Sequence, residues 1–272
     1  MGKIRSGGEV SLIERQYWDA RRHRDPVDDV TLDYVREQVL RPFYEGGSDK
    51  YTCNKIAFHG ILNRCWEKKH VLDYACGDGF WAVYFALTGA GKVSGFDLSP
   101  VGIERGRERV TRQGLDSIVD LRTMDARRLE YPDNCFDLVI GHGAIHHTIK
   151  YPNVFAELHR VMKPGTSAFF LENLADFRPW RWHWKIKGPI AEGDVPIFTR
   201  ELREKASMFA EMNITGDTLL YSIKMFWKRQ PGPVGRWLLR LAKKSDDFLF
   251  RRFPSLRNCG SFSYIELKKG DQ

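Results

Sequence analysis

The alternation of apolar and polar positions divides the chain into a central part and two flanks. In the central part, short apolar runs are followed by amphipathic stretches whose apolar residues recur every three or four positions. The elements expected there are, in order, strand 70–74, helix 80–88, strand 92–97, helix 99–113, strands 118–122 and 136–141, helix 151–162 and strand 166–172. Strands that alternate with helices form a parallel sheet with helices on both faces. The pattern therefore predicts an α/β domain.

The N-terminal flank, residues 1–69, has a mostly helical pattern. Thr31 can cap one helix, because its hydroxyl can accept a hydrogen bond from a backbone N–H of the first turn. A second helix is expected over residues 54–67, where apolar residues follow the helical period. We expect this flank to form a helical cap.

The C-terminal flank combines helices with strand-like segments. It is expected to contain a helix at 199–208, a strand at 214–223, a helix at 233–252 and a strand at 260–268. Before them, residues 174–197 interrupt the alternation and are rich in tryptophan, proline and basic residues. We therefore assign residues 70–272 to one domain with an insert at 174–197.

A glycine-rich turn follows the first central strand, in residues 71–79 (VLDYACGDG). Ala75, Gly77 and Gly79 are small, so a ligand can approach the backbone closely, and the amides of the next helix point toward it. The dinucleotide pattern G-x-G-x-x-G is matched only in part, because alanine stands at the third glycine. Asp73, within the strand, would repel a pyrophosphate but suits a ligand that carries an ammonium group.

A second acid ends the next strand, since Asp97 follows Asp73 by 24 residues. An acid at this place can accept hydrogen bonds from ribose hydroxyls. A nucleoside joined to an amino acid satisfies both acids, and S-adenosylmethionine is such a molecule. The two acids therefore indicate this cofactor, which becomes S-adenosylhomocysteine after methyl transfer.

Five motifs in order make the chain resemble the class I S-adenosylmethionine-dependent methyltransferases. They are residues 71–79, 93–99 (VSGFDLS), 124–126 (MDA), 136–147 (FDLVIGHGAIHH) and 158–173 (LHRVMKPGTSAFFLEN). The closest subgroup is similar to the ubiquinone and menaquinone biosynthesis methyltransferases. Ala75 departs from the family, which most often has glycine there. The resemblance implies a Rossmann-like, doubly wound sheet of seven strands in the order 3-2-1-4-5-7-6, with the last strand antiparallel and the N-terminal helices and the insert as a cap.

The resemblance also implies roles for individual residues. The cofactor would contact Asp73, Ala75, Gly77, Gly79, Asp97, Leu98, Asp125, Ala126, Gly141 and His142. Asp73 would bind the amino group, Asp97 the ribose hydroxyls and Asp125 the adenine amino group. Taken alone, Asp97 and Asp125 would more often be helix caps or turn acids.

Candidate catalytic residues follow strands four and five. Methyl transfer from a sulfonium is an in-line displacement, so the protein chiefly positions the acceptor, and a base helps only if the acceptor loses a proton. The candidates are His146 and His147, with His142 beside them, and Glu172; histidine titrates near neutral pH. The alternatives are structural: a histidine bonded to a loop carbonyl, and Glu172 paired with an arginine.

Aromatic residues outside the motifs are the candidates for the acceptor side. Tyr17 and Trp18 lie in the N-terminal flank, and Trp180, Trp182 and Trp184 lie in the insert. The tryptophans occupy alternate positions, so an extended segment would place them on one face. Three interpretations are open: a lid over an apolar or anionic acceptor, a membrane-interface anchor, or a cap packed on the core.

The charge is concentrated in the last third of the chain. Residues 1–173 carry 24 basic and 24 acidic side chains, whereas residues 174–272 carry 19 and 11, which accounts for the whole net charge of +8. This part could touch a membrane surface, or the helix at 233–252 could simply expose a solvated basic face. Nucleic acid fits less well, because the segment after strand four lacks the Asn/Asp-Pro-Pro-aromatic motif of base-modifying amino methyltransferases.

The remaining composition suggests a cytoplasmic protein without a metal. The five cysteines show no zinc-like spacing, and no signal peptide or membrane-spanning run is evident. We expect methyl transfer from S-adenosylmethionine to oxygen or nitrogen, with carbon as a further option, of a small organic molecule. The alternatives are a nucleic-acid methyltransferase and a non-catalytic cofactor-binding protein that docks on a partner or membrane. The acceptor and the oligomeric state stay open.

Overall fold

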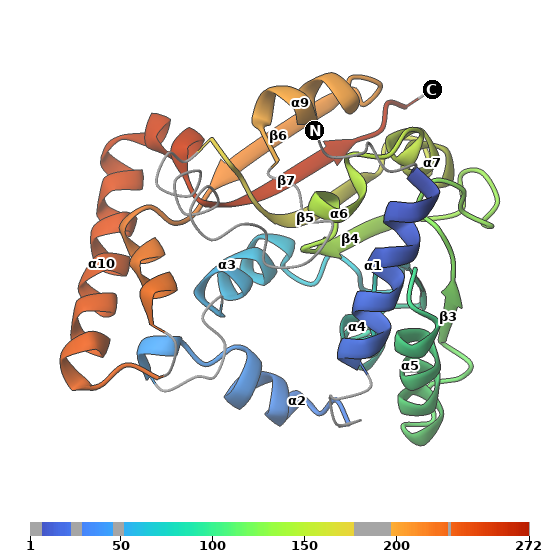
Figure 1. Cartoon of the computed structure of the whole chain (residues 1–272), viewed down its shortest axis with the longest axis horizontal. Coiled ribbons are helices and arrows are strands. Elements are labelled where there is room, and N and C mark those ends of the chain that lie inside the picture. Colours follow the sequence, from blue (N-terminus) through green and yellow to red (C-terminus); the bar gives the residue numbers. More distant parts are fainter. Residues whose placement is uncertain (1–6, 23–28, 46–51, 177–196, 228–229, 272) are drawn as a thin grey trace.

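A seven-stranded sheet forms the centre of the protein (Figure 1). The computed structural model describes residues 7–22, 29–45, 52–176, 197–227 and 230–271. The strands are β1 (His70–Tyr74), β2 (Lys92–Asp97), β3 (Val119–Thr123), β4 (Leu138–His142), β5 (Ser167–Asn173), β6 (Glu211–Gly216) and β7 (Phe262–Lys268). They are ordered β3-β2-β1-β4-β5-β7-β6, and β7 runs antiparallel to both β5 and β6. The predicted Rossmann-like order is confirmed.

Helices cover both faces of this sheet. One face carries α3 (Thr52–Leu62), α4 (Phe80–Leu87) and α5 (Pro100–Arg112), and the other carries α7 (Val154–Val161) and α9 (Thr199–Lys205). On the first face, Val83 and Ile103 are buried with Val93 of β2. On the second, Leu158 and Val139 belong to the same buried cluster. The helical apolar period of the sequence is thus used to fill two cores, one on each side of the strands.

Several predicted elements differ in their bounds from the structure. The strand expected at 214–223 ends at Gly216, and η3 (Leu220–Phe226) is a 3-10 helix. The buried carboxylate of Asp246 explains the change, because it accepts the backbone N–H groups of Leu219, Leu220 and Tyr221. The helix expected from residue 151 begins at Val154, since Asn153 has a φ of 65° that does not continue a helix.

The N-terminal flank is helical, as predicted. It contains α1 (Gly7–Arg22), α2 (Leu32–Tyr34), the π-helical η1 (Val35–Val39) and the 3-10 helix η2 (Phe43–Glu45). Thr31 Oγ1 accepts the N–H of Tyr34, which confirms the predicted cap. Helix α3 stops at Leu62, five residues before the predicted end, because Asn63 and Arg64 have positive φ values of 41° and 55°.

The longest helix of the described residues, α10 (Pro233–Arg252), matches its predicted bounds. It packs on η2, η3 and η4 (Pro254–Cys259). In Figure 1 it forms one end of the molecule, far from α5 at the other end. Within the described parts of the chain, no helix has both the length and the apolar character needed to cross a bilayer.

A buried lysine joins the two flanks. Lys224 of η3 is fully buried, and its Nζ donates to Oδ1 of Asn54 in α3 at 2.7 Å. The ammonium group also lies over the rings of Tyr221 and Phe262, at 4.6 and 4.7 Å. Asn54 Nδ2 in turn donates to Asp217 at 3.0 Å. Buried charges need such partners, so α3 is tied to the C-terminal elements.

Candidate functional site

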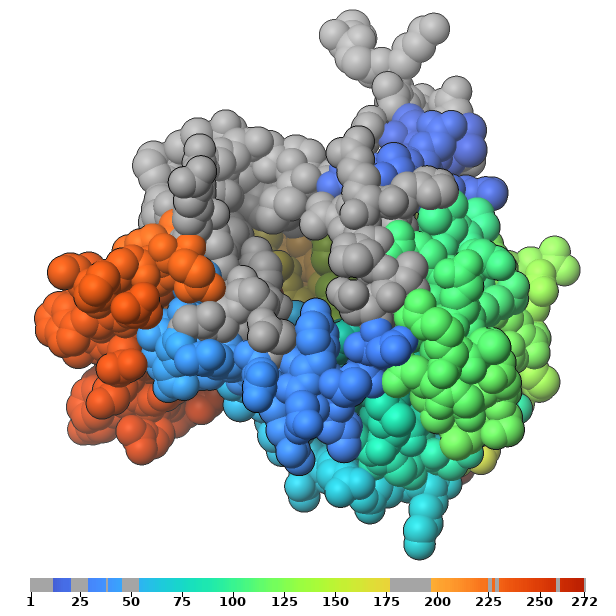
Figure 2. Space-filling model, turned by 90° about the horizontal axis from the view of Figure 1, so that it is seen from below, coloured from blue at the N-terminus to red at the C-terminus, as the bar shows by residue number. Residues whose placement is uncertain are grey.

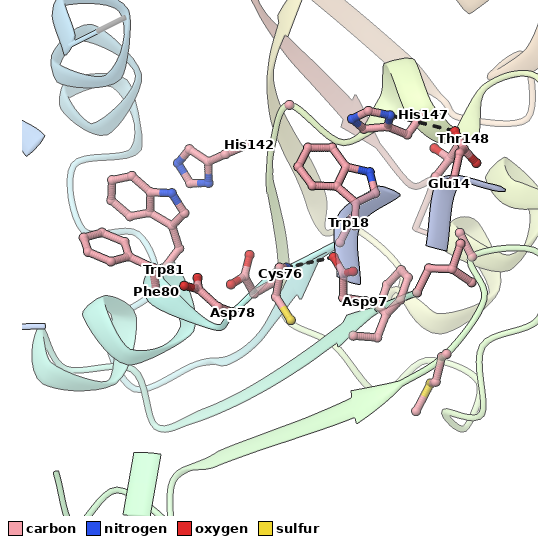
Figure 3. A pocket seen from close by; sticks show the side chains of 18 of the residues that line it. Glu14, Trp18, Cys76, Asp78, Phe80, Trp81, Asp97, His142, His147 and Thr148 are labelled. Carbon is pink, nitrogen blue, oxygen red and sulfur yellow. Dashed lines mark hydrogen bonds and ion pairs between the residues drawn. The ribbon is translucent and has the colours of Figure 1, made fainter. Parts of the chain in front are cut away.

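A cavity of about 460 Å³ lies beside the carboxyl ends of the parallel strands, where ligands bind in open α/β sheets. Its walls come from the turn after β1, the ends of β2 and β4, the loop after β3, and helices α1 and α3 (Figure 3). Eight of the ten predicted cofactor residues line it: Asp73, Ala75, Gly77, Asp97, Leu98, Asp125, Ala126 and His142. Elements far apart in the sequence therefore meet at one place.

The other two predicted residues, Gly79 and Gly141, serve packing. A Cβ at Gly79 would come 2.6 Å from Leu121 Cδ1, and one at Gly141 would come 2.5 Å from the Phe170 ring. Both glycines therefore leave room behind the cavity for strand side chains, Leu121 of β3 and Phe170 of β5.

The turn after β1 has an unusual backbone. Ala75, Gly77 and Gly79 have φ values of 53°, 60° and 70°, all in the left-handed region. Glycine adopts this region freely, whereas an L-residue pays about 1–2 kcal/mol for it. The family preference for glycine at position 75 thus has a physical reason, and this chain carries strain there. The N–H of Gly77 donates to Asp97 Oδ2 at 2.8 Å, which holds the turn against β2.

Asp73 is the most unusual acid of the cavity. It is 2% exposed, and its Oδ2 has no hydrogen-bond partner. Burial, with smaller contributions from Asp97 and Asp78, raises the pKa of its carboxyl to about 8. A buried oxygen without a partner beside a lined cavity fits a ligand with a cationic donor, and the ammonium group of S-adenosylmethionine is of this kind.

Asp97 and Asp125 lie farther along the same wall. Asp97 accepts the N–H of Gly77 with one oxygen and that of Ser99 with the other, at 2.8 and 2.9 Å. Asp125 accepts the N–H of Arg127 at 2.9 Å and pairs with its guanidinium, the closest contact being 2.6 Å. Both carboxylates are thus held in place, as the turn-acid interpretation expects, and both still line the cavity.

An aromatic wall closes one end of the cavity, where Figure 3 shows Phe80, Trp81 and His142 together. The rings of Trp81 and His142 are stacked, with centroids 4.3 Å apart and planes 10° apart. His59 of α3 stacks on Trp81 as well, and its Nε2 lies 3.4 Å from Nε2 of His142. Neither histidine has a partner for Nδ1. Burial lowers the pKa of His59 to about 4 and that of His142 well below its ordinary value, so both rings are neutral.

Glu172 and His146 form a structural pair outside the cavity lining. The buried Glu172 accepts the N–H groups of Ala144 and Ile145 with one oxygen, at 2.6 and 2.5 Å. Its other oxygen lies 2.8 Å from His146 Nδ1. The partner of Glu172 is therefore a histidine with two amides, where the sequence suggested an arginine. This arrangement fixes the loop after β4 to the end of β5.

His147 lines the opposite end of the cavity from His142 (Figure 3). Its ring meets Trp18 of α1 edge-on at 5.3 Å, and its Nδ1 lies 3.9 Å from Glu14. Burial, with the neighbouring His146 and Lys150, lowers the pKa of His147 to about 2. This end of the cavity therefore also presents a neutral imidazole.

Helix α1 reaches the cavity through Trp18, which the sequence suggested, and through Glu14, which it did not. The buried Glu14 pairs with Lys150 Nζ at 2.6 Å and accepts the hydroxyl of Tyr151 at 2.7 Å. Trp18 lines the cavity, whereas its predicted neighbour Tyr17 does not and contacts Trp18 edge-on. No local pattern marks Glu14, because its partners lie more than a hundred residues away.

Lys55 of α3 also lines the cavity and was not anticipated. The insert tryptophans Trp180, Trp182 and Trp184 lie outside the described residues. Among the residues that are described, no group of three or more histidine, cysteine, aspartate or glutamate side chains is placed to hold a metal ion.

Known proteins with similar sequences match the central part of the chain. Residues 71–165 match the family described as "Methyltransferase domain". The chain is 37% identical over 151 residues to demethylmenaquinone methyltransferase of Symbiobacterium thermophilum, which covers 50% of this chain and 60% of that protein. It is 35% identical over 129 residues to the protein of the same name from Lactiplantibacillus plantarum, covering 44% and 54%. The chain thus spans little more than half the length of these relatives.

Solved structures agree with the fold over nearly the whole chain. A geranyl diphosphate methyltransferase in complex with GPP and sinefungin has a TM-score of 0.62 at 16% identity, covering 97% of this chain and 100% of that one. Phosphoethanolamine N-methyltransferase 2 of Haemonchus contortus has a TM-score of 0.61 at 16% identity, covering 100% of this chain and 62% of that one. At these identities the likeness establishes the fold alone. Strand order and the matched region agree: residues 71–165 match a methyltransferase domain, and the fold of the chain is that of the class I S-adenosylmethionine-dependent methyltransferases.

Proposed function

We propose that the protein binds S-adenosylmethionine in this cavity and transfers its methyl group to an oxygen or nitrogen atom of a small organic molecule. Carbon is the third acceptor atom that the chemistry allows. The observation that carries the proposal is the unpartnered, buried oxygen of Asp73 beside the left-handed turn. An ammonium group placed there would supply the missing donor and let the carboxyl ionise.

The other acids of the cavity suit the remaining parts of the same ligand. A carboxylate oxygen has two lone pairs, so Asp97 can accept ribose hydroxyls while it holds the amides of Gly77 and Ser99. Asp125, held by Arg127, can accept the adenine amino group in the same way. Leu98 lines the cavity with Asp97 and offers an apolar contact to the adenine ring. In this arrangement the methionine end of the ligand would lie toward Asp73 and the aromatic wall.

When bound, the cofactor supplies a methyl group on a positively charged sulfur. The chain has to align the acceptor with this group and exclude water. Where the acceptor must lose a proton, we assign the base to Nδ1 of His142, which has no partner and belongs to a ring that lines the cavity. Its lowered pKa keeps the imidazole neutral, so it does not repel the sulfonium. His147 lies at the far end, and His146 is engaged by Glu172.

His59 is the positioning residue of this arrangement. A hydrogen bond between two Nε2 atoms requires that one carries the proton and the other accepts it. When His142 donates from Nε2, its Nδ1 is bare and can accept a proton. The contact allows either direction, and we propose the one in which His59 accepts from His142, because it leaves Nδ1 of His142 free to act as a base.

The aromatic wall favours a flat acceptor. Trp81 and His142 present stacked rings, Phe80 stands beside them, and Lys55 brings a basic group into the cavity. The curated relatives are named for demethylmenaquinone, an aromatic quinone whose reduced form carries acidic hydroxyl groups. We propose an acceptor of this general kind, a hydroxylated aromatic ring, for this chain.

The first experiment measures S-adenosylhomocysteine binding by calorimetry, followed by methyl transfer from S-adenosylmethionine to a panel. The panel contains a reduced naphthoquinone, simple phenols, phosphoethanolamine, geranyl diphosphate and RNA. Transfer to a phenolic hydroxyl or ring supports the proposal. Cofactor binding without transfer to any member would indicate a binding protein, and transfer to RNA alone would replace the small-molecule assignment.

The base is tested once an acceptor is known. His142→Asn should lower kcat for an acceptor that must lose a proton, and leave S-adenosylhomocysteine affinity within about twofold. His59→Gln should lower kcat with little change in KM. The control is His159→Asn, because that residue lies on α7 outside the cavity lining. An unchanged kcat for His142→Asn would remove His142 from the chemistry.

A further inference from the structure

Helix α10 has two apolar faces, and only one of them is packed by the part of the chain that the structure describes. Leu239, Ala242 and Phe250 are buried against the neighbouring 3-10 helices. A second set is exposed: Val234 (72%), Trp237 (60%), Leu238 (39%), Leu241 (49%) and Phe248 (60%). The second face is therefore not explained by the fold.

The exposed residues form a stripe along the helix, with Lys244 and Ser245 in the turn between Leu241 and Phe248. The spacing of the stripe residues, three, four and seven positions, places them on one side of an α-helix. From Val234 to Phe248 the stripe is about 21 Å long at the helical rise per residue. It stands at the end of the molecule that the orange and red residues form in Figures 1 and 2. Val234, Trp237, Leu238 and Leu241 adjoin one another, and contiguous exposed apolar surface in a globular protein marks an interaction site.

Basic side chains accompany the stripe. Helix α10 contains six arginine or lysine residues and two aspartates, a net charge of +4. Asp246 is buried and holds three backbone amides, so Asp247 is the only exposed acid of the helix. Lys244, Arg251 and Arg252 are exposed. The surface that accompanies the apolar stripe is thus strongly positive.

We propose that α10 docks on the surface of an anionic lipid bilayer, lying flat with the stripe between the headgroups and the acyl chains. An apolar face beside a basic one is the pattern of interfacial helices, and tryptophan is favoured at that depth. A second copy of the chain is a poorer occupant, because it would bring two helices of charge +4 together. A nucleic acid would satisfy the charges but leave Trp237, Leu241 and Phe248 in water. This inference does not depend on the methyl acceptor.

Vesicle sedimentation of the full chain tests the apolar stripe. Wild-type protein should sediment with vesicles of equal parts phosphatidylcholine and phosphatidylglycerol, and much less with phosphatidylcholine alone. A triple variant, Trp237→Ser with Leu241→Ser and Phe248→Ser, should lower the partition coefficient at least about tenfold. Leu87→Ser with Met208→Ser, two exposed apolar positions outside α10, is the matched control and should bind as wild type does. Circular dichroism and thermal unfolding verify that each variant is folded.

A charge variant tests the lipid preference. Lys244→Gln with Arg251→Gln should reduce binding to anionic vesicles about tenfold or more, since each basic residue near such a surface adds roughly a factor of five. Lys92→Gln with Arg128→Gln, which are exposed elsewhere, is the control. Failure of the wild type to sediment with anionic vesicles would overturn the proposal. Unchanged vesicle binding by the stripe variant would also overturn it. A third contrary result would be a wild-type protein that binds no vesicles and forms a dimer in light scattering, with the dimer lost in the stripe variant.

Discussion

Asp73 should make the ligand-free protein less stable as the pH rises. Burial raises the pKa of its carboxyl from 3.8 to about 8, so between these values the folded protein holds a proton that the unfolded chain releases. The protonated carboxyl of Asp73 makes its full stabilising contribution below the pKa of the unfolded chain, 3.8. This contribution is lost as the pH rises through the pKa of the folded protein, about 8. One proton of difference changes the free energy of unfolding by about 1.4 kcal/mol per pH unit. From pH 5 to pH 7, Asp73 alone should therefore cost about 2–3 kcal/mol.

Asp73→Asn removes the titrating group and keeps its shape. Urea unfolding of the wild type and the variant at pH 5, 6 and 7 measures the two slopes, and the difference between them is the contribution of Asp73. Asp120→Asn is the matched control, because Asp120 is a partly exposed acid of β3 paired with Arg122. The control should keep the wild-type slope. Parallel pH dependences for the wild type and Asp73→Asn would refute the reasoning.

The same experiment distinguishes an empty site from an occupied one. Saturating S-adenosylhomocysteine should place its ammonium group against an ionised Asp73 and flatten the slope of the wild type. Binding near pH 7 should then release a proton, which calorimetry in buffers of different ionisation enthalpy detects. Asp73→Asn should show neither the flattening nor the release.

Three further predictions concern neighbouring residues. Asp97→Ala should weaken S-adenosylhomocysteine binding more than tenfold, which is about 1.4 kcal/mol of binding free energy. The variant loses the proposed ribose contact and the hydrogen bond to the N–H of Gly77. Unchanged affinity in calorimetry would contradict the cofactor assignment. Ala75→Gly should raise the free energy of unfolding by up to about 1 kcal/mol, because relief of the left-handed backbone strain exceeds the gain in conformational freedom of the unfolded chain. A clearly lower melting temperature of the variant would show that this strain is absent. Glu172→Ala should lower the free energy of unfolding by at least about 2 kcal/mol in urea, because two buried amides lose their acceptor; a neutral effect would mean that another group replaces it.

Local signals in the sequence accounted for most of the sheet. The strands predicted at 70–74 and 92–97 and the helix at 233–252 have the observed bounds, because each is a regular apolar pattern ended by a turn residue or a breaker. The failure at 214–223 has a non-local cause. Its second half carries apolar residues suited to a strand, but Asp246, about 25 residues farther on, captures the backbone amides. No pattern within residues 214–223 predicts these hydrogen bonds to Asp246.

The candidate site divides in the same way. Asp73 and Asp97 could be expected because each belongs to a strand whose carboxyl end must face the cavity. The contact between His59 and His142 joins residues 83 positions apart, and the contacts of Glu14 span still more of the chain. Such pairs depend on the position and angle at which each helix packs on the sheet, and hydrophobic periodicity does not specify either of them. The acceptor end was therefore the least predictable part of the site.

The bond between Lys224 and Asn54 bears on how this protein can change over evolution. It ties α3, which carries His59 and Lys55, to the C-terminal elements through a fully buried ammonium group. A chimaera that exchanged only the C-terminal third with that of a relative would remove one member of this bond and leave the other buried. The two flanks should therefore be inherited as a unit, whereas the cofactor domain between them can be shared widely.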